Sequence, residues 1–314
     1  MVHLVDAHLY VFRAYHSLPP MEAPDGTPTN AAYGFAGTLI KLLSERAPGH
    51  AACCFDFALT SFRNELFPDY KASRGTEPPP DLEPQFALCK EVASALGLPV
   101  FEREGYEADD VIATLCARIR AGGGRAVVVS GDKDLAQLVT GDDGVVLLDL
   151  ARERTLDAEA VRARFGVEPA RIPDWLALVG DASDDLPGVP GFGPKRAAAA
   201  LAAFGALEAI PEEPDAWKQA GLRSAARLAA AWATHREQAL RVRDLATVVR
   251  DVPGIAPSVE ALAWRGPDRE AFEALATRLG WRGILRRLPR PGPSGATSSP
   301  RGPLAGVGEK SLET

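Results

Sequence analysis

Short apolar runs alternate with helix-like segments along the first half of the chain. Runs of strand length, several of them rich in β-branched residues, occur at 2–6, 50–56, 100–102, 125–130 and 145–149. Segments with apolar residues at helical spacing lie between them, at 29–46, 83–96, 107–120 and 133–139. Strands that alternate with helices are typical of a mostly parallel sheet with helices on both faces. The pattern therefore predicts an α/β domain.

Two parts of the chain depart from this alternation. The segment 60–82 is polar and ends in three consecutive prolines, which is typical of a surface loop or arch. Beyond about residue 172, helices and Gly/Pro turns dominate, and all five tryptophans lie there. We therefore expect an α/β domain at 1–170 with the arch at about 60–82, a helical domain at 171–288, and a disordered tail rich in Pro, Gly and Ser at 289–314.

Carboxylates stand where the predicted strands end. Asp6 closes the first strand and Asp56 the second, while Asp132 and Asp134 follow the strand at 125–130. Parallel strands bring their carboxyl ends to one edge of a sheet, so we expect these acids to meet there.

The motif GYEADD adds three acids, Glu107, Asp109 and Asp110, at the start of a predicted helix, where the positive dipole end favours anions. One such acid alone is usually a helix cap. So many carboxylates together repel one another and resist burial. Divalent cations with oxygen ligands relieve that repulsion. The sequence therefore predicts a two-metal site of the kind that cleaves phosphodiesters.

A second block, GDASDDLPGVPGFGPKRA, follows in the helical part. Asp181 and Asp184 are three residues apart, which places both on one face of a turn or helix. Two glycine-rich turns then expose backbone N–H groups before a helix that we expect to begin near Pro194. A glycine-rich turn alone is usually only a turn. Placed directly after an acidic pair, this one favours a hairpin that grips a phosphate.

The formal net charge of -7 at first argues against a nucleic-acid partner. The nine carboxylates named above account for it, and the remainder is mildly basic. The four cysteines form no CxxC or Cys/His cluster, so we expect buried, reduced thiols and no zinc site. The N-terminus shows no basic region or long apolar run. We expect neither a signal peptide nor a membrane span, and a cytoplasmic location.

Five stretches of the chain resemble the 5′-nuclease (flap endonuclease) family. They are LVDAHLYVFRAYHSLP, FDFALTSFRNELFPDYKASR, GYEADDVIATL, VVSGDKDLAQLV and LVGDASDDLPGVPGFGPKRAA, spread over residues 4–204. The resemblance is greatest to the 5′→3′ exonuclease domain of bacterial DNA polymerase I, and we expect a stand-alone protein of this kind. It implies a PIN-like parallel sheet flanked by helices, with a helical arch, and a C-terminal helix–three-turn–helix domain of the helix-hairpin-helix type.

The resemblance also implies roles for the acids. It assigns the first metal to Asp6, Asp56, Glu107 and Asp109, the second to Asp132, Asp134 and Asp184, and outer-shell positions to Asp110 and Asp181. Hard cations with carboxylate and water ligands favour Mg²⁺, with Mn²⁺ as a substitute. The family also suggests K⁺ at the hairpin.

Contacts with DNA are implied at further positions. Lys71 and Arg74 of the arch are expected at the scissile phosphate, where they offset charge in the transition state. DNA-binding positions are Phe12, Arg13, Arg63, Tyr70, Gly188, Gly191, Gly193 and Lys195. Tyr70 either stacks on a base or anchors the arch, and Phe12 either stacks on a frayed terminal base pair or belongs to the core.

Two positions depart from the family pattern. Ala7 stands where Gly is usual, and Asp185 stands where Asn is usual. Neither change removes an expected metal ligand. Asp185 adds a negative charge near the expected DNA path.

These features predict a structure-specific, metal-dependent 5′→3′ exonuclease or flap endonuclease. Its expected substrates are 5′ flaps, nicked duplexes and RNA–DNA primers, its products carry a 5′-phosphate, and we expect a monomer. The alternative is a catalytically weak protein that binds branched DNA, which would be expected to lack some of the acids. A PIN-like RNase without a hairpin is disfavoured by GVPGFGPK. A dinucleotide enzyme is disfavoured because no GxGxxG follows the first strand.

Overall fold

A central sheet organises the first half of the chain in the computed structural model, which describes residues 1–75, 77–141 and 144–289. Its strand order is β3-β2-β1-β4-β5-β6. The strands are Val2–Asp6 (β1), Ala51–Cys54 (β2), Val100–Phe101 (β3), Ala126–Val129 (β4), Val145–Asp149 (β5) and Arg154–Leu156 (β6). The first five run parallel, and β6 pairs antiparallel with β5. The predicted mostly parallel sheet is confirmed.

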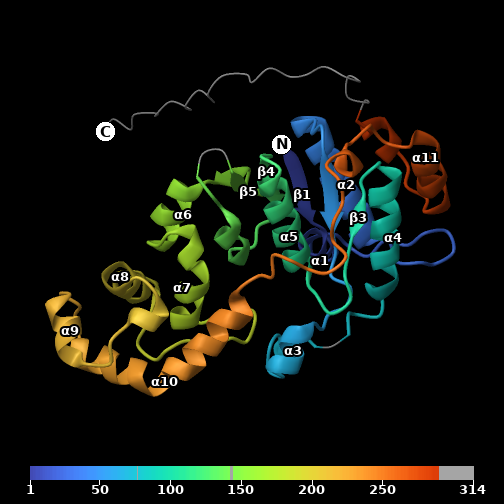
Figure 1. Cartoon of the computed structure of the whole chain (residues 1–314). Helices are drawn as coiled ribbons and strands as arrows, with labels where there is room; N and C mark the ends of the chain where they lie inside the picture. The colour runs from blue at the N-terminus through green and yellow to red at the C-terminus, as the bar shows by residue number, and fades with distance from the viewer. Residues whose placement is uncertain (76, 142–143, 290–314) are drawn as a thin grey trace, which may run out of the picture.

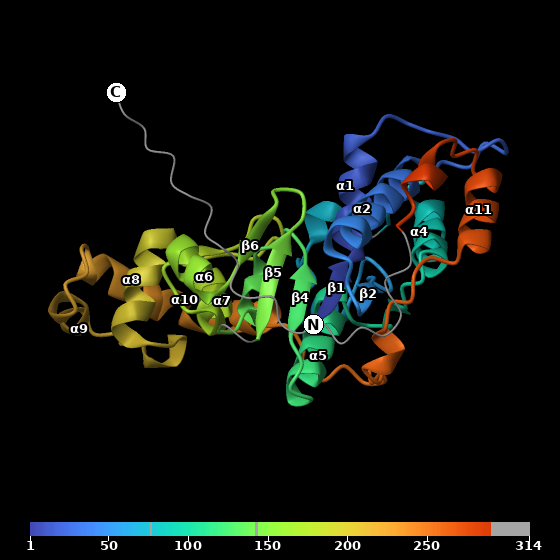
Figure 2. The same ribbon diagram turned by 90° about the horizontal axis from the view of Figure 1, so that it is seen from above.

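Helices cover both faces of the sheet, as Figure 2 shows. Helices Ala7–Ser17 (α1), Asn30–Arg46 (α2) and Glu83–Ala95 (α4) lie on one face, and Ala108–Ala121 (α5) lies on the other. Because side chains alternate along a strand, Cys53 packs with the α2 side and Cys54 with the α5 side. All four cysteines are buried and free, as the sequence predicts.

The strand register brings the acids to one edge. Asp6 is the last residue of β1 and lies opposite Cys54 of β2, while Val5 lies opposite Val129 of β4. The three strands therefore end level with one another. Asp56 follows β2 by two residues and Asp132 follows β4 by three, so both emerge at the edge where Asp6 lies.

The segment predicted to form a helical arch contains short helices. Phe62–Leu66 (α3) begins with a capping box in which Ser61 and Asn64 satisfy each other's backbone amides. A 3-10 turn, Ala72–Arg74 (η1), follows. Residue 76, within this segment, lies outside the described residues.

The second half forms a group of helices beside the sheet (Figure 1). They are Ala158–Phe165 (α6), Ile172–Val179 (α7), Pro194–Phe204 (α8), Pro214–Gln219 (α9) and Ala225–Ala246 (α10). Trp217 and Trp232 are fully buried there, and the Trp217 ring lies 5.9 Å from Phe192 and 5.1 Å from Phe204. Helix α8 begins at Pro194, as expected.

The last described segment returns to the α/β domain. The Trp264 amide donates to Gly49 and its indole Nε1 donates to the Leu96 carbonyl at 2.8 Å. Arg269–Arg278 (α11) then packs beside α4, and Figure 1 shows the two helices together. The expected helical domain at 171–288 thus lies in two places, one beside the sheet and one against α4. The expected disordered tail lies, from residue 290 on, outside the described residues.

No helix in the described part of the chain is long and apolar enough to cross a lipid bilayer.

Candidate active site

The carboxylate of Asp6 is fixed at the junction of β1 and α1. It caps α1 by accepting the Leu9 amide at 3.2 Å, and it accepts the Ser130 hydroxyl at 2.7 Å. The same Ser130 oxygen accepts the Asp132 amide at 3.0 Å. One serine after β4 therefore ties two strand-end acids together.

The first turn of α5 is held in a similar way. Asp56 accepts the Ala108 amide at 2.6 Å, and Glu107 and Asp110 form a capping box around the helix start. Glu107 also accepts the Ser61 hydroxyl at 2.9 Å, which connects it to the base of the arch. These bonds fix the start of α5 so that Glu107 and Asp109 line the strand edge.

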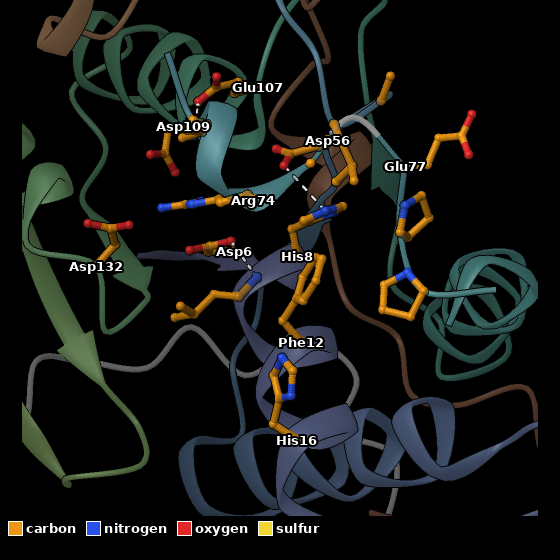
Figure 3. Close-up of a pocket in the computed structure, with 17 residues that line it drawn as sticks. Asp6, His8, Phe12, His16, Asp56, Arg74, Glu77, Glu107, Asp109 and Asp132 are labelled. Carbon is orange, nitrogen blue, oxygen red and sulfur yellow. Dashed lines mark hydrogen bonds and ion pairs between the residues drawn. The ribbon is translucent and has the colours of Figure 1, made fainter. Parts of the chain in front are cut away.

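A pocket of about 500 Å³ lies where these elements meet. Its acidic lining consists of Asp6, Asp56, Glu77, Glu107, Asp109 and Asp132. In Figure 3, Asp6, Asp109 and Asp132 point into a common space and Arg74 reaches toward them from the arch. The predicted gathering of acids from β1, β2, α5 and the β4 loop is therefore present in the structure.

Burial and the charges of neighbouring carboxylates raise the pKa of two of these acids, Asp6 and Asp109. Burial, together with the neighbouring Asp132 charge, raises the pKa of Asp6 to about 7 although Ser130 opposes the change. Burial and the charges of Asp6 and Asp132 raise the pKa of Asp109 well above its ordinary value. For Glu107, by contrast, Lys71 and Arg63 outweigh burial and lower the pKa. The centre of the pocket, at Asp6 and Asp109, thus lacks compensating positive charge, whereas Glu107 at its rim has it.

A second acidic group lies next to the pocket. Asp134, Asp181 and Asp184 each offer a ligand atom, and these atoms lie within 4.8 Å of one another. Burial and the Asp132 charge raise the pKa of Asp134, whose Oδ1 is buried without a hydrogen-bond partner. Asp181 was expected in an outer position, yet the structure brings it into this group. Its carboxylate is paired with the ammonium of Lys133 at 2.5 Å.

The arch places two cations against these acids. The Lys71 ammonium lies 2.8 Å from Glu107, and the Arg74 guanidinium pairs with Asp184. The Tyr70 hydroxyl bonds to both Glu107 and Asp184 at 3.3 Å, and its side chain is buried. Of the two roles expected for Tyr70, the structure favours the anchor of the arch over a base-stacking surface.

Arg63 was predicted to contact DNA, but its side chain is buried in the scaffold beside the pocket. Its side chain is 2% exposed and bonds Asp110 through both terminal nitrogens, at 2.7 and 2.8 Å. It also donates to the carbonyls of Leu245 and Thr247 at the end of α10. Asp110 is fully buried and further accepts the Val249 amide. Neither residue faces the pocket, because the pair joins α3, α5 and the segment after α10.

Of three further expected DNA contacts, one lies in the pocket and two lie outside its lining. Phe12 lines the pocket with its ring 5.2 Å from His8, while Arg13 is exposed on α1. Lys195 is exposed in the first turn of α8. These three positions are accessible to a ligand.

The glycines of the hairpin between α7 and α8 differ in their surroundings. A Cβ at Gly188 would lie 2.3 Å from the Val179 carbonyl oxygen, so this glycine permits a close crossing of the chain. Gly191 has φ +91°, and Gly193 precedes α8 with open space around it. Gly191 needs glycine for its φ and its carbonyl accepts a hydrogen bond from the Arg196 guanidinium, Gly193 has open space around it, and Gly188 is explained by packing.

Several residues of the site were not singled out from the sequence. Ser130 and Ser61 orient acids, Lys133 neutralises one, and the His8 ring stacks on Phe86 with a centroid distance of 4.8 Å. Ser130 and Lys133 lie inside SGDKD, so their place between strand-end acids was a usable signal. Nothing local marked Ser61, whose partner Glu107 is 46 residues away.

Two family models together match most of the chain. The model described as 5'-3' exonuclease, N-terminal resolvase-like domain, matches residues 1–166. The model described as 5'-3' exonuclease, C-terminal SAM fold, matches residues 167–270.

Curated relatives extend this result. DNA polymerase I of Bacillus caldotenax is 39% identical over 293 residues, which are 92% of this chain and 32% of the relative. DNA polymerase I of Pseudomonas aeruginosa is 39% identical over 303 residues, 95% of this chain and 33% of the relative. The chain therefore spans about a third of the length of the curated relatives it matches.

Solved structures agree on the fold. The T5 D15 protein co-crystallised with metal ions matches with a TM-score of 0.60 and 19% identity, covering 91% of this chain and 98% of that chain. The catalytic core of Rad2 in complex with DNA substrate matches with a TM-score of 0.58 and 17% identity, covering 89% and 88%. The predicted PIN-like domain with a helical second part is confirmed.

Proposed function

The chain belongs to the 5'-3' exonuclease family, and we propose that it is a structure-specific 5′→3′ exonuclease and flap endonuclease that hydrolyses DNA phosphodiesters with two metal ions. The observation that carries the proposal is the convergence of Asp6, Asp109 and Asp132 from separate elements on one pocket. A fold gains nothing in stability from buried acids that repel one another, so their arrangement is best explained by cations they bind.

The residues fit divalent metals. The Oδ1 of Asp134 is buried without a hydrogen-bond partner, 3.8 Å from the Lys133 ammonium, and burial raises the pKa of Asp6. Both features indicate carboxylates that a bound cation would satisfy. We assign one site to the pocket acids and the other to Asp134, Asp181 and Asp184, with Asp132 between them. All-oxygen ligands favour Mg²⁺, with Mn²⁺ as a substitute. When bound, such ions supply charge stabilisation at the phosphate and an activated water.

The arch supplies the remaining positive charge. Lys71 and Arg74 lie at the pocket and pair with Glu107 and Asp184, and half of the Arg74 side chain is exposed. Both can turn from their acids to a phosphate that enters the pocket. There they offset the charge that develops as the bond to the 3′-oxygen breaks and a 5′-phosphate is left.

We assign the duplex to the hairpin before α8. The open backbone of Gly191 and Gly193, the N-terminus of α8 and exposed Lys195 are suited to phosphate oxygens. Contacts of this kind select the structure of a nucleic acid rather than its sequence, which suits 5′ flaps, nicks and RNA–DNA primers. The same turn is our proposed place for K⁺. Phe12 in the pocket wall is placed to stack on a terminal base.

Cleavage of a 5′-labelled flap DNA in Mg²⁺ tests the proposal. We expect release of a short 5′ fragment, lost with EDTA and lost with Asp132→Ala. Lys41→Met is a matched control, because Lys41 pairs with exposed Glu153 away from the pocket. This variant should cleave the flap at the wild-type rate.

Tight binding of the flap without cleavage in Mg²⁺ or Mn²⁺ would contradict the proposal. It would favour the alternative of a DNA-binding protein with weak catalysis.

A further inference from the structure

The arch is docked on the loop that carries the second acidic group. At three nearby positions an arch nitrogen donates to the 183–185 loop. The Lys71 amide donates to the Asp184 carbonyl at 3.0 Å, the Ser73 amide to the Asp185 carboxylate at 2.8 Å, and Arg74 Nε to the Ser183 carbonyl at 2.9 Å. Arg74 also pairs with the Asp184 carboxylate through its Nη2. Of these bonds, the one from the Ser73 amide alone depends on which residue stands at 185.

The backbone fixes the direction of that carboxylate. Asp185 has φ +55°, a left-handed conformation that Asp and Asn adopt more readily than other residues with a Cβ. On either side of it, Asp181 and Leu186 pair through their backbones at 2.8 and 2.9 Å and close the loop. The Asp185 carboxylate is therefore held outward, toward the arch and away from the acids.

Ser73 stands between the two functional cations of the arch. It lies in the short 3-10 turn whose first flanking residue is Lys71 and whose last residue is Arg74. Lys71 itself has φ +55°, an uncommon conformation that needs support from its surroundings. A bond that fixes Ser73 therefore fixes the backbone from which both cations reach the pocket.

We propose that Asp185 is a positioning residue that latches segment 71–74 to the 183–185 loop, so that Lys71 and Arg74 face the acids before DNA arrives. The latch itself is a property of the folded chain, and only its effect on cleavage rests on the proposed function. Asn also accepts an amide hydrogen and tolerates the left-handed conformation. The latch thus needs the side-chain oxygen of residue 185, and its charge is dispensable.

Limited trypsin digestion of the full chain in EDTA tests the latch without any nuclease assay. We compare the wild type with Asp185→Ala, Asp185→Asn and Asp25→Ala, following cleavage after Lys71 and after Arg74 by mass spectrometry. Asp25 is the matched control, because its exposed carboxylate also accepts one backbone amide, that of Thr27, in another loop.

We expect Asp185→Ala to speed cleavage at these two bonds by about tenfold, the factor that corresponds to about 1.4 kcal/mol of local stability. Asp185→Asn and Asp25→Ala should leave it unchanged. An unchanged rate in Asp185→Ala would overturn the proposal, and so would faster cleavage at sites spread over the whole chain.

A second measurement separates the latch from the chemistry. On flap DNA we expect Asp185→Ala to lower kcat by several-fold while the Kd for DNA in EDTA stays within about twofold, with kcat restored in Asp185→Asn. If the trypsin result supports the latch but the wild type shows no nuclease activity, that outcome counts against the proposed function and not against the latch. A loss of DNA affinity equal to the loss in kcat would overturn positioning as the role of Asp185.

Discussion

The two acidic groups of the site are held in different ways. Two pocket acids at the sheet edge are oriented by neutral donors, with Ser130 on Asp6 and the Ala108 amide on Asp56. Glu107, at the rim, accepts the Ser61 hydroxyl but also pairs with the Lys71 ammonium. The second group is held mainly by ammonium and guanidinium groups, with Lys133 on Asp181 and Arg74 on Asp184. Neutral donors orient a carboxylate and leave its charge, whereas cations neutralise it. Asp6 and Asp56 are thus prepared for metal, whereas Asp181 and Asp184 must first release the ammonium and guanidinium groups paired with them.

The largest expected effect is at Asp109, in the centre of the pocket acids. Asp109→Asn removes a charge whose burial among Asp6 and Asp132 is unfavourable. We expect cleavage of flap DNA to fall by at least about 10²–10³-fold, the scale for loss of one preorganised electrostatic group. We expect the melting temperature in EDTA to rise, because the repulsion is gone.

Kinetics and thermal unfolding of the same preparation check both halves of this prediction. A variant that loses activity and stability together would show that Asp109 is held by favourable contacts, against our account of the pocket.

The next effect concerns the scaffold beneath α5. Arg63→Met leaves the buried charge of Asp110 without its partner, and removing one member of a buried ion pair typically costs about 3–5 kcal/mol. Urea unfolding measures the change. Arg162→Met is the control, because its pair with Glu168 is solvent-exposed and such pairs are worth about 0–1 kcal/mol. Equal effects of the two substitutions would refute a structural role for Arg63.

Acid–base behaviour should distinguish the pocket from an ordinary surface. The pKa of Asp6 is raised to about 7 in the folded chain, against about 3.9 for an unfolded aspartate. Between these values the folded state holds a proton that the unfolded state has lost. The contribution of Asp6 to the free energy of unfolding therefore falls as pH rises from about 4 to about 7, and the loss is complete above that.

We expect the melting temperature in EDTA to be higher at pH 5.5 than at pH 8 for this reason, and Mg²⁺ to restore it at pH 8 because bound cations favour the ionised acids. Asp6→Asn should flatten the profile in EDTA. A melting temperature that rises over this range in EDTA would contradict the burial argument.

Most of the fold could be predicted from the sequence, because the strand, helix and turn signals along the chain agree with one another. Strand β5 has the predicted bounds, and α2 and α4 begin or end within a residue of them. The strand-end acids were found for the same reason, since parallel topology alone brings Asp6, Asp56 and Asp132 together.

The local sequence pattern does not predict which residue pairs with each charged side chain. Arg63 in a polar arch resembles a phosphate contact, and only the approach of residues 245–249 makes it a buried anchor for Asp110. In the same way, nothing near Trp264 in sequence indicates that it packs on Leu96, 168 residues away. Long-range packing decides these cases, and a single sequence does not reveal it.

The smallest expected effect tests the second acidic group directly. The Lys133 ammonium is paired with Asp181 and lies 3.8 Å from Asp134, so a divalent ion must compete with it for these oxygens. Lys133→Met should tighten Mn²⁺ binding at one of the two sites by about tenfold, or about 1.4 kcal/mol. The site formed by the pocket acids should keep its affinity.

Calorimetric titration of the EDTA-treated chain with Mn²⁺ measures both sites, and Lys41→Met, which removes an ammonium from an exposed pair elsewhere, is the matched control. If Lys133→Met weakens Mn²⁺ binding instead, the ammonium orients Asp181 for the metal rather than competing with it. The contrast between a prepared pocket and a neutralised second group would then be wrong, because both groups would be preorganised, one by neutral donors and the other by a cation.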